Sequence, residues 1–262
     1  METLLVERAD GITTVTLHRP DKKNAIDGRM WRELIQVFDE VADDSNARVL
    51  VITGAGDGFC SGADLTDQEN AEDLQGGVGG GIRSMRVVGR AALRLHELPL
   101  PTIAAVNGVA AGAGLNLALG CDLVIASDRA RFSEIFSKRG LSVDFGGSWL
   151  LPRLIGMHRA KELVFLADII DAAEADRIGL VNRVVPHDDL DAAVREIAER
   201  LAALPPVQLS VSKRLLNQSL SVSMADALEF EDVAQVLNFQ SADTAEAVAA
   251  FVQKRPPEFT GR

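Results

Sequence analysis

The chain has 262 residues, 47% of them hydrophobic, which is enough to bury a core in one large domain with a smaller terminal region. Its 38 acidic and 27 basic residues give a formal net charge of −11, which argues against nucleic acid and against an anionic membrane surface as main partners. Two cysteines without metal-ligand spacing, no apolar run long enough to span a bilayer and no signal-like start favour a cytoplasmic location.

The N-terminal residues predict a hairpin followed by a helix. Alternating apolar residues predict strands over 4–6 and 12–17, and Asp10-Gly11 between them is a typical two-residue hairpin turn. Asp27 is placed to N-cap a helix that runs to about residue 42, because the apolar residues after it recur at helical spacing.

Strands and helices then alternate up to residue 126. Buried strands are predicted over 49–53, 102–106 and 121–126, with one helix over 82–97 and another ending at 119. This alternation is typical of an α/β fold with mainly parallel strands. Residues 66–81 are polar and then rich in glycine, so we expect a mobile loop there.

Helices dominate the rest of the chain. Helices are predicted over 159–167, 172–178 and 190–204, with a short strand over 181–185. Pro205-Pro206 is the strongest boundary and divides the chain into a core of residues 1–204 and a C-terminal region of residues 205–262. That region predicts three amphipathic helices without a strand partner, which should pack on a neighbouring subunit or over the core; their ranges are 207–220, 223–239 and 241–253.

Two turns of small residues carry the clearest functional signal. One spans Gly58 to Leu65 after the strand at 49–53, and the other spans Asn107 to Gly114 after the strand at 102–106. Small side chains leave backbone N–H groups open to a ligand. Two such turns can form a two-donor oxyanion hole, which suits a substrate whose carbonyl oxygen gains negative charge during reaction.

Five ordered blocks, which include both turns, resemble the enoyl-CoA hydratase/isomerase (crotonase) superfamily; they are residues 18–26, 59–65, 103–114, 147–156 and 175–185. The resemblance implies an α/β spiral of ββα units with a C-terminal helical region that assembles as a trimer or a dimer of trimers. It also implies a coenzyme A thioester as substrate. No permanently bound cofactor and no metal site are expected.

The resemblance also implies the residues of the site. The backbone N–H groups of Ala63 and Ala113 are the expected oxyanion donors, since alanine keeps the approach clear and Ala113 lies near a helix N-terminus. The expected CoA-binding residues are Lys22, Lys23, Ala25, Ala63, Asp64, Leu65, Ala113, Phe251 and Lys254. The alternatives are tight strand-to-helix connections for the two turns, a solvated lysine pair, a capping role for Asp64 and a simple helix end at Phe251.

The chain departs from the hydratase pattern at both of its glutamate positions. Asn116 takes the first and Phe136 the second, and neither side chain exchanges a proton at neutral pH. Glu134 lies two residues from the second position, an offset that turns a helical residue about 200° away. We therefore interpret Glu134 as a surface or capping carboxylate, with a catalytic role as the alternative.

Asp144 sits where isomerase-type members carry their acid, including the ring-epoxide isomerase branch of phenylacetate degradation. One carboxylate can perform a 1,3-proton shift, whereas hydration more naturally uses two groups. Between Val143 and Phe145 a buried Asp144 should have a raised pKa. The alternative is an Asx turn or a cap before a helix at Gly147.

The leading hypothesis is therefore double-bond isomerisation of an enoyl-CoA, with Asp144 as acid and base and with Asn116 in the site. Hydration by Asp144 and a water held by Asn116 or the glycine loop is the alternative. A non-catalytic acyl-CoA-binding homologue is the third possibility.

Overall fold

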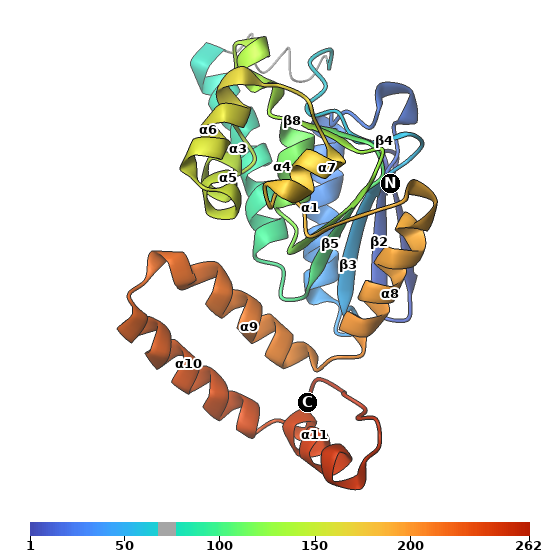
Figure 1. Cartoon of the computed structure of the whole chain (residues 1–262), viewed down its shortest axis with the longest axis vertical. Helices are drawn as coiled ribbons and strands as arrows, with labels where there is room; N and C mark the ends of the chain where they lie inside the picture. Colours follow the sequence, from blue (N-terminus) through green and yellow to red (C-terminus); the bar gives the residue numbers. More distant parts are fainter. Residues whose placement is uncertain (68–76) are drawn as a thin grey trace.

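Two β-sheets form the centre of the computed structural model, which describes residues 1–67 and 77–262 (Figure 1). The larger sheet has six strands in the order β1 (Leu4–Ala9), β2 (Ile12–Leu17), β3 (Val49–Gly54), β5 (Thr102–Val106), β7 (Leu123–Ser127) and β10 (Arg183–Val185). All its neighbouring strands are parallel except β1 and β2. Asp10 and Gly11 both have positive φ, as a tight hairpin turn requires, so the predicted hairpin is confirmed.

The smaller sheet consists of very short strands in the order β4 (Gly58–Cys60), β6 (Val109–Ala111), β8 (Arg131–Ser133) and β9 (Ile170–Asp171). Three times in succession the chain passes from the large sheet to the small one, through β3–β4, β5–β6 and β7–β8. The predicted spiral of ββα units is confirmed.

Both faces of the large sheet are covered. Alternate residues of a strand point to opposite faces, so Leu50 and Ile52 of β3 join one hydrophobic core with α1 (Gly28–Asp43) and α4 (Ala113–Leu119). Val49 and Val51 join a second core with α8, which spans Leu190–Ala202. This double burial explains why the strands have almost continuous apolar sequences.

The helix α3 (Gly77–His96) begins five residues earlier than predicted. The expected loop over 66–81 is wrong for residues 77–81, which are helical, and 68–76 lie outside the described residues. Val88, Ala91 and Leu95 of α3 are buried. Packing of this later part allows the helix to propagate backwards through glycines whose intrinsic preference opposes it.

The remaining helices agree with the predictions within a few residues. Asp27 caps α1, because its carboxylate accepts a hydrogen bond of 2.8 Å from the Met30 amide. The others are α6 (Met157–Leu166), α7 (Ala172–Arg177), α9 (Pro206–Gln218), α10 (Met224–Phe239) and α11 (Ala242–Gln253). A further helix, α5 (Gly147–Ile155), begins at the expected Gly147, and no end was predicted for it. No helix in the described parts of the chain is long and apolar enough to cross a membrane.

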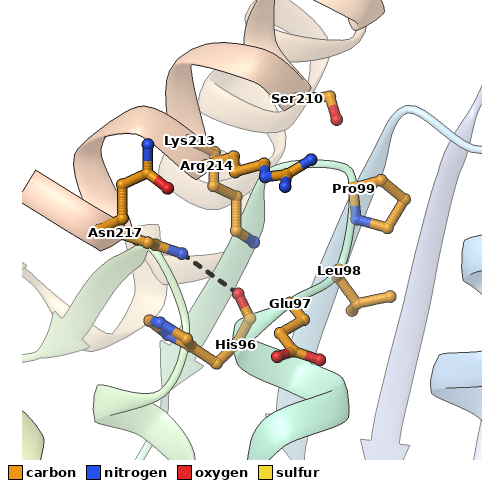
Figure 2. Close-up of a pocket in the computed structure, with 9 residues that line it drawn as sticks. His96, Glu97, Leu98, Pro99, Ser210, Lys213, Arg214 and Asn217 are labelled. Atoms are coloured by element: carbon orange, nitrogen blue, oxygen red, sulfur yellow. Dashed lines mark hydrogen bonds between the residues drawn. The ribbon is translucent and has the colours of Figure 1, made fainter. Parts of the chain in front are cut away.

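The C-terminal helices α9, α10 and α11 extend away from the sheets as an arm (Figure 1). Lys213 of α9 joins the arm to the body, since its Nζ lies 2.7 Å from Asp122 Oδ2 and 3.0 Å from the Leu100 carbonyl oxygen. A cavity of about 540 Å³ beside this anchor is drawn in Figure 2, where Asn217 donates a hydrogen bond to the His96 carbonyl. None of the predicted site residues lines it.

Candidate functional site

The two glycine turns are in direct contact. An added Cβ on Gly114 would lie 2.4 Å from the Cys60 carbonyl oxygen, and one on Gly62 would lie 2.9 Å from the Ala111 carbonyl oxygen. The same Gly62 position is 3.7 Å from the amide nitrogen of Ala113. Because no side chain fits at either glycine, the backbone of one turn can rest against the backbone of the other.

Ala63 and Ala113 present N–H groups at this contact. Ala113 is the first residue of α4, so its N–H has no acceptor within the helix. The backbone of Ile26 pairs with the two residues that flank Ala63. Its N–H donates to the Gly62 carbonyl oxygen, and its carbonyl oxygen accepts from the Asp64 N–H. Within residues 1–67 and 77–262, neither alanine N–H donates a hydrogen bond. Two N–H groups without an acceptor among the described residues therefore lie on two turns that touch each other.

The backbone around Asp144 is held in an unusual conformation. Phe145 and Gly146 both have positive φ, at 48° and 81°, and a phenylalanine in this region carries strain. The Phe145 ring stacks on Trp31 of α1, with ring centroids 5.3 Å apart, and Phe145 is buried. This packing holds the turn in place and so fixes the backbone conformation from which the Asp144 side chain extends.

The Asp144 carboxyl group does not cap α5. The cap position is Gly146, and Asp144 contributes to the turn only through its backbone carbonyl, which accepts from the Gly147 amide at 2.9 Å. Its Oδ1 atom is buried and has no hydrogen-bond partner among the described residues. Burial raises the pKa of this carboxyl to about 6. The capping alternative is wrong, and a carboxyl group near neutral pKa remains for chemistry.

Asn116 links Asp144 to the second turn. It lies three residues after Ala113 in α4, is fully buried, and its Nδ2 donates to the Asp144 carbonyl oxygen at 3.0 Å. An added Cβ on Gly147 would lie 2.4 Å from the same Nδ2, so the amide is packed against the start of α5. The site thus combines two free N–H donors, an amide and a carboxyl group.

Glu134 is not a surface or capping carboxylate, contrary to its sequence interpretation. It is fully buried, it makes no capping bond, and its Oε2 is 3.5 Å from Asn116 Nδ2. Burial raises its pKa to about 8. The helical offset argument failed because the backbone at Glu134 is not helical: φ is −83° and ψ is 63°, before a short 3₁₀ helix that starts at Ile135.

A buried phenylalanine, Phe136, takes the place of the second glutamate of the hydratase pattern. Phe136 is buried, and an added Cβ on Gly112 would lie 3.6 Å from its ring. Phe136 therefore packs beside the turn that leads into Ala113.

Asp64 anchors a cluster of cations. Its Oδ2 lies 2.9 Å from an Arg19 guanidinium nitrogen and 2.8 Å from Lys22 Nζ, and its Oδ1 accepts from Thr66. Burial alone would raise the Asp64 pKa, but hydrogen bonds from Lys22, Thr66 and Arg19 hold that pKa well below its ordinary range. Arg19 was missed from sequence; its position just before Pro20 and the lysine pair was the available signal.

Replacing Asp64 with asparagine should lower the free energy of unfolding by about 2 to 3 kcal/mol at neutral pH, because Arg19 and Lys22 would keep their charges and lose the Asp64 carboxylate. The Asp64 pKa is lowered in the folded state, so this stabilisation is present above the ordinary pKa of 3.8 and declines as pH falls below it. Chemical denaturation at neutral and acid pH measures both effects. Asp57→Asn, at an exposed carboxylate nearby, is the control. An Asp64→Asn deficit that stays constant into acid would contradict this account.

The structure brings only some of the predicted CoA-binding residues together. Lys22, Lys23 and Ala25 lie on the turn that contacts Asp64 and Ser61. Leu65 is exposed beside Asp64. Phe251 and Lys254 belong to α11 and its C-cap, at the far end of the arm, so within one chain they do not reach the turns (Figure 1).

Known proteins resemble this chain over almost its full length. The enoyl-CoA hydratase/isomerase family profile matches residues 7–262. An Escherichia coli (strain K12) protein described as 1,2-epoxyphenylacetyl-CoA isomerase is 40% identical over the full length of both chains. A Clostridium acetobutylicum protein described as a short-chain-enoyl-CoA hydratase is 36% identical over 98% of this chain and 97% of its own. The crystal structure of an enoyl-CoA hydratase from Bacillus anthracis superposes with a TM-score of 0.92 at 32% identity, covering 99% of this chain and 100% of that one.

Proposed function

Since the chain belongs to the enoyl-CoA hydratase/isomerase family, we propose that it is an acyl-CoA-transforming enzyme that moves a double bond within an enoyl-CoA. One observation carries the proposal: Asp144, whose buried Oδ1 has no hydrogen-bond partner among the described residues, accepts through its backbone carbonyl from Asn116, in the helix turn that begins at the free N–H of Ala113. The relative described as an isomerase also supports isomerisation over hydration.

In the proposed mechanism the thioester oxygen accepts hydrogen bonds from the N–H groups of Ala63 and Ala113. As the proton leaves C2, negative charge moves onto this oxygen, and fixed donors in a site shielded from water stabilise it. The Asp144 carboxylate takes the C2 proton and returns it to C4 of the dienolate. The double bond then lies between C2 and C3, and Asp144 is a carboxylate again.

The pKa of Asp144 fits this double role. A group with a pKa of about 6 is mostly ionised at pH 7, yet its conjugate acid is strong enough to return the proton. Phe136 in place of a glutamate leaves no second carboxylate at the position that hydratases use for water.

Hydration of a 2-enoyl-CoA is the second candidate. Asn116 Oδ1 and Asp144 Oδ1 are both buried without partners among the described residues, and together they could hold one water. A relative described as a short-chain-enoyl-CoA hydratase favours this alternative.

Proton NMR in deuterated buffer separates these candidates. We expect a 3-enoyl-CoA to be converted to its 2-enoyl isomer with deuterium at C2 and C4. A new 3-hydroxyacyl signal from a 2-enoyl-CoA would contradict isomerisation and indicate hydration. Binding without any exchange of C2 or C4 protons would indicate a non-catalytic acyl-CoA-binding protein.

We also propose that residues 205–262 are an oligomerisation region that packs against further copies of this chain as a trimer or a dimer of trimers. The arm exposes large apolar side chains that a free monomer would leave in water; they include Leu216, Leu220, Met224, Val233, Phe239, Phe251 and Val252. Assembly would let α11 place Phe251 and Lys254 near the CoA of another subunit. Light scattering after size-exclusion chromatography tests this, and a monomer would contradict it.

A further inference from the structure

Glu134 is a buried acid for which the proposed mechanism has no use. Two other carboxylates are similarly buried, and both are well supplied with donors: Asp64 has Arg19 and Lys22, and Asp243 accepts from two backbone amides at 2.7 and 2.8 Å. Among the described residues, Glu134 has only the 3.5 Å contact with Asn116 Nδ2. An ionised carboxylate in such a place would be very costly, so this environment favours the neutral acid.

The neighbouring acceptors need a donor. Asn116 Oδ1, Glu134 Oε1 and Asp144 Oδ1 are all buried without a partner in the described parts of the chain. The Asn116 amide cannot be reversed to help, because its Nδ2 must face the Asp144 carbonyl oxygen, which only accepts. The two Asn116 Nδ2 hydrogens face the Asp144 carbonyl oxygen and Glu134 Oε2, and Asp144 is mostly ionised at neutral pH, so a proton on Glu134 is the hydrogen that remains for these acceptors.

We propose that Glu134 is a positioning residue of this site: it stays a neutral carboxylic acid at neutral pH, supplies the donor that the Asn116–Asp144 pair lacks, and so keeps the Asn116 amide against the Asp144 backbone. Its role in catalysis rests on the proposed function of Asp144. Glu134 acts through these two neighbours. When it loses its proton, a second negative charge arises beside Asp144 and the cluster loses its donor.

Few other charges face Glu134. The helix α4 carries no ionisable residue, and the half-buried Asp144 raises the pKa of Glu134 in addition to the larger effect of burial. The elements packed around Glu134 are β8, the 3₁₀ helix and the helices α5, α6 and α7, and nearly all their charged side chains are exposed. The exception is Glu174, which is half-buried and paired with Arg177. The exposed residues are Arg131, Lys138, Arg139, Arg153, His158, Arg159, Lys161, Glu162, Asp176 and Arg177. Burial and Asp144 thus set the protonation state.

The first test needs no substrate. Glu134→Gln has nearly the same shape and remains neutral at every pH. The folded wild type keeps a proton that the unfolded chain releases above about 4.5, so wild-type stability should fall, relative to the variant, as pH rises from about 5 to about 8. We expect the gap between the two melting temperatures to widen over this range. Glu162→Gln, at an exposed glutamate of α6, should show a constant gap. A constant gap for Glu134→Gln would overturn the proposal.

The second test is the pH profile of kcat for a 3-enoyl-CoA. Wild type should gain activity through about pH 6, as Asp144 ionises, and lose it above about pH 8, as Glu134 ionises. Glu134→Gln should keep the rise and lose the alkaline fall. An unchanged alkaline fall in the variant would overturn the positioning role. If neither protein isomerises any probe while the melting gap still widens, the proposed function fails and the neutral state of Glu134 stands.

Discussion

Replacing Asp144 with alanine should reduce kcat by about 10²- to 10⁴-fold, equivalent to about 3 to 5 kcal/mol of transition-state stabilisation. The reason is that the residues at the two glutamate positions of the hydratase pattern cannot replace it: Asn116 cannot exchange a proton, and Phe136 is apolar. Stopped-flow absorbance with a 3-enoyl-CoA measures the loss. KM should change much less, since CoA and the thioester oxygen keep their contacts.

The same substitution should lower kcat without lowering the thermal stability of the protein. Burial raises the Asp144 pKa to about 6, so the ionised carboxylate destabilises the folded protein above that pH. The Asp144→Ala variant should therefore melt no lower than wild type at neutral pH. Ser142→Ala, at an exposed position in the same loop, is the matched control and should keep both kcat and melting temperature. A large fall in the melting temperature of Asp144→Ala would indicate a structural role.

The second large effect is expected for Ala113→Pro. Proline at the first position of a helix is well tolerated, because the N–H that it lacks has no partner within the helix. At Ala113 it should remove one of the two proposed oxyanion donors and place ring carbons where the oxygen would bind. We expect kcat to fall by about 10²- to 10³-fold, with the fold retained.

Met157→Pro is the matched control for this effect. Met157 also begins a helix after a glycine cap, in α6, and its side chain is exposed. The same backbone change there should leave kcat unaltered. Equal kcat values for the two proline variants would contradict the assignment of Ala113 as a donor, and circular dichroism spectra of both would exclude unfolding.

Much of the large sheet could be predicted because each of its signals is local. The Asp10-Gly11 turn, the Asp27 cap and the apolar runs at 49–53 and 102–106 need only neighbours in sequence. The strands β4, β6, β8 and β9 are two or three residues long, which is too short for an alternation pattern. The strands β4, β6 and β8 can pair because each follows a strand of the large sheet, and those strands already lie side by side.

The sequence motifs predicted which residues belong to the candidate site, but not how those residues are buried and packed. Ala63, Ala113 and Asp144 came from motifs, whereas the burial of Glu134 depends on a backbone that leaves helical geometry just before Ile135. Likewise, the contact of Trp31 with Phe145 joins residues more than a hundred positions apart. Such contacts leave no periodic trace, and the start of α3 at Gly77 depends on packing that propensity alone opposes.

The claim that one carboxylate moves the proton is tested most directly with a 3-enoyl-CoA deuterated at C2, followed for a single turnover in ordinary water. A single acid that is shielded from solvent should return part of the label to the same molecule, so the account predicts deuterium at C4 of the 2-enoyl product. Asp144→Ala should give neither product nor transfer. Full conversion with no deuterium at C4 would contradict the account, because a single acid shielded from water must carry part of the label to C4.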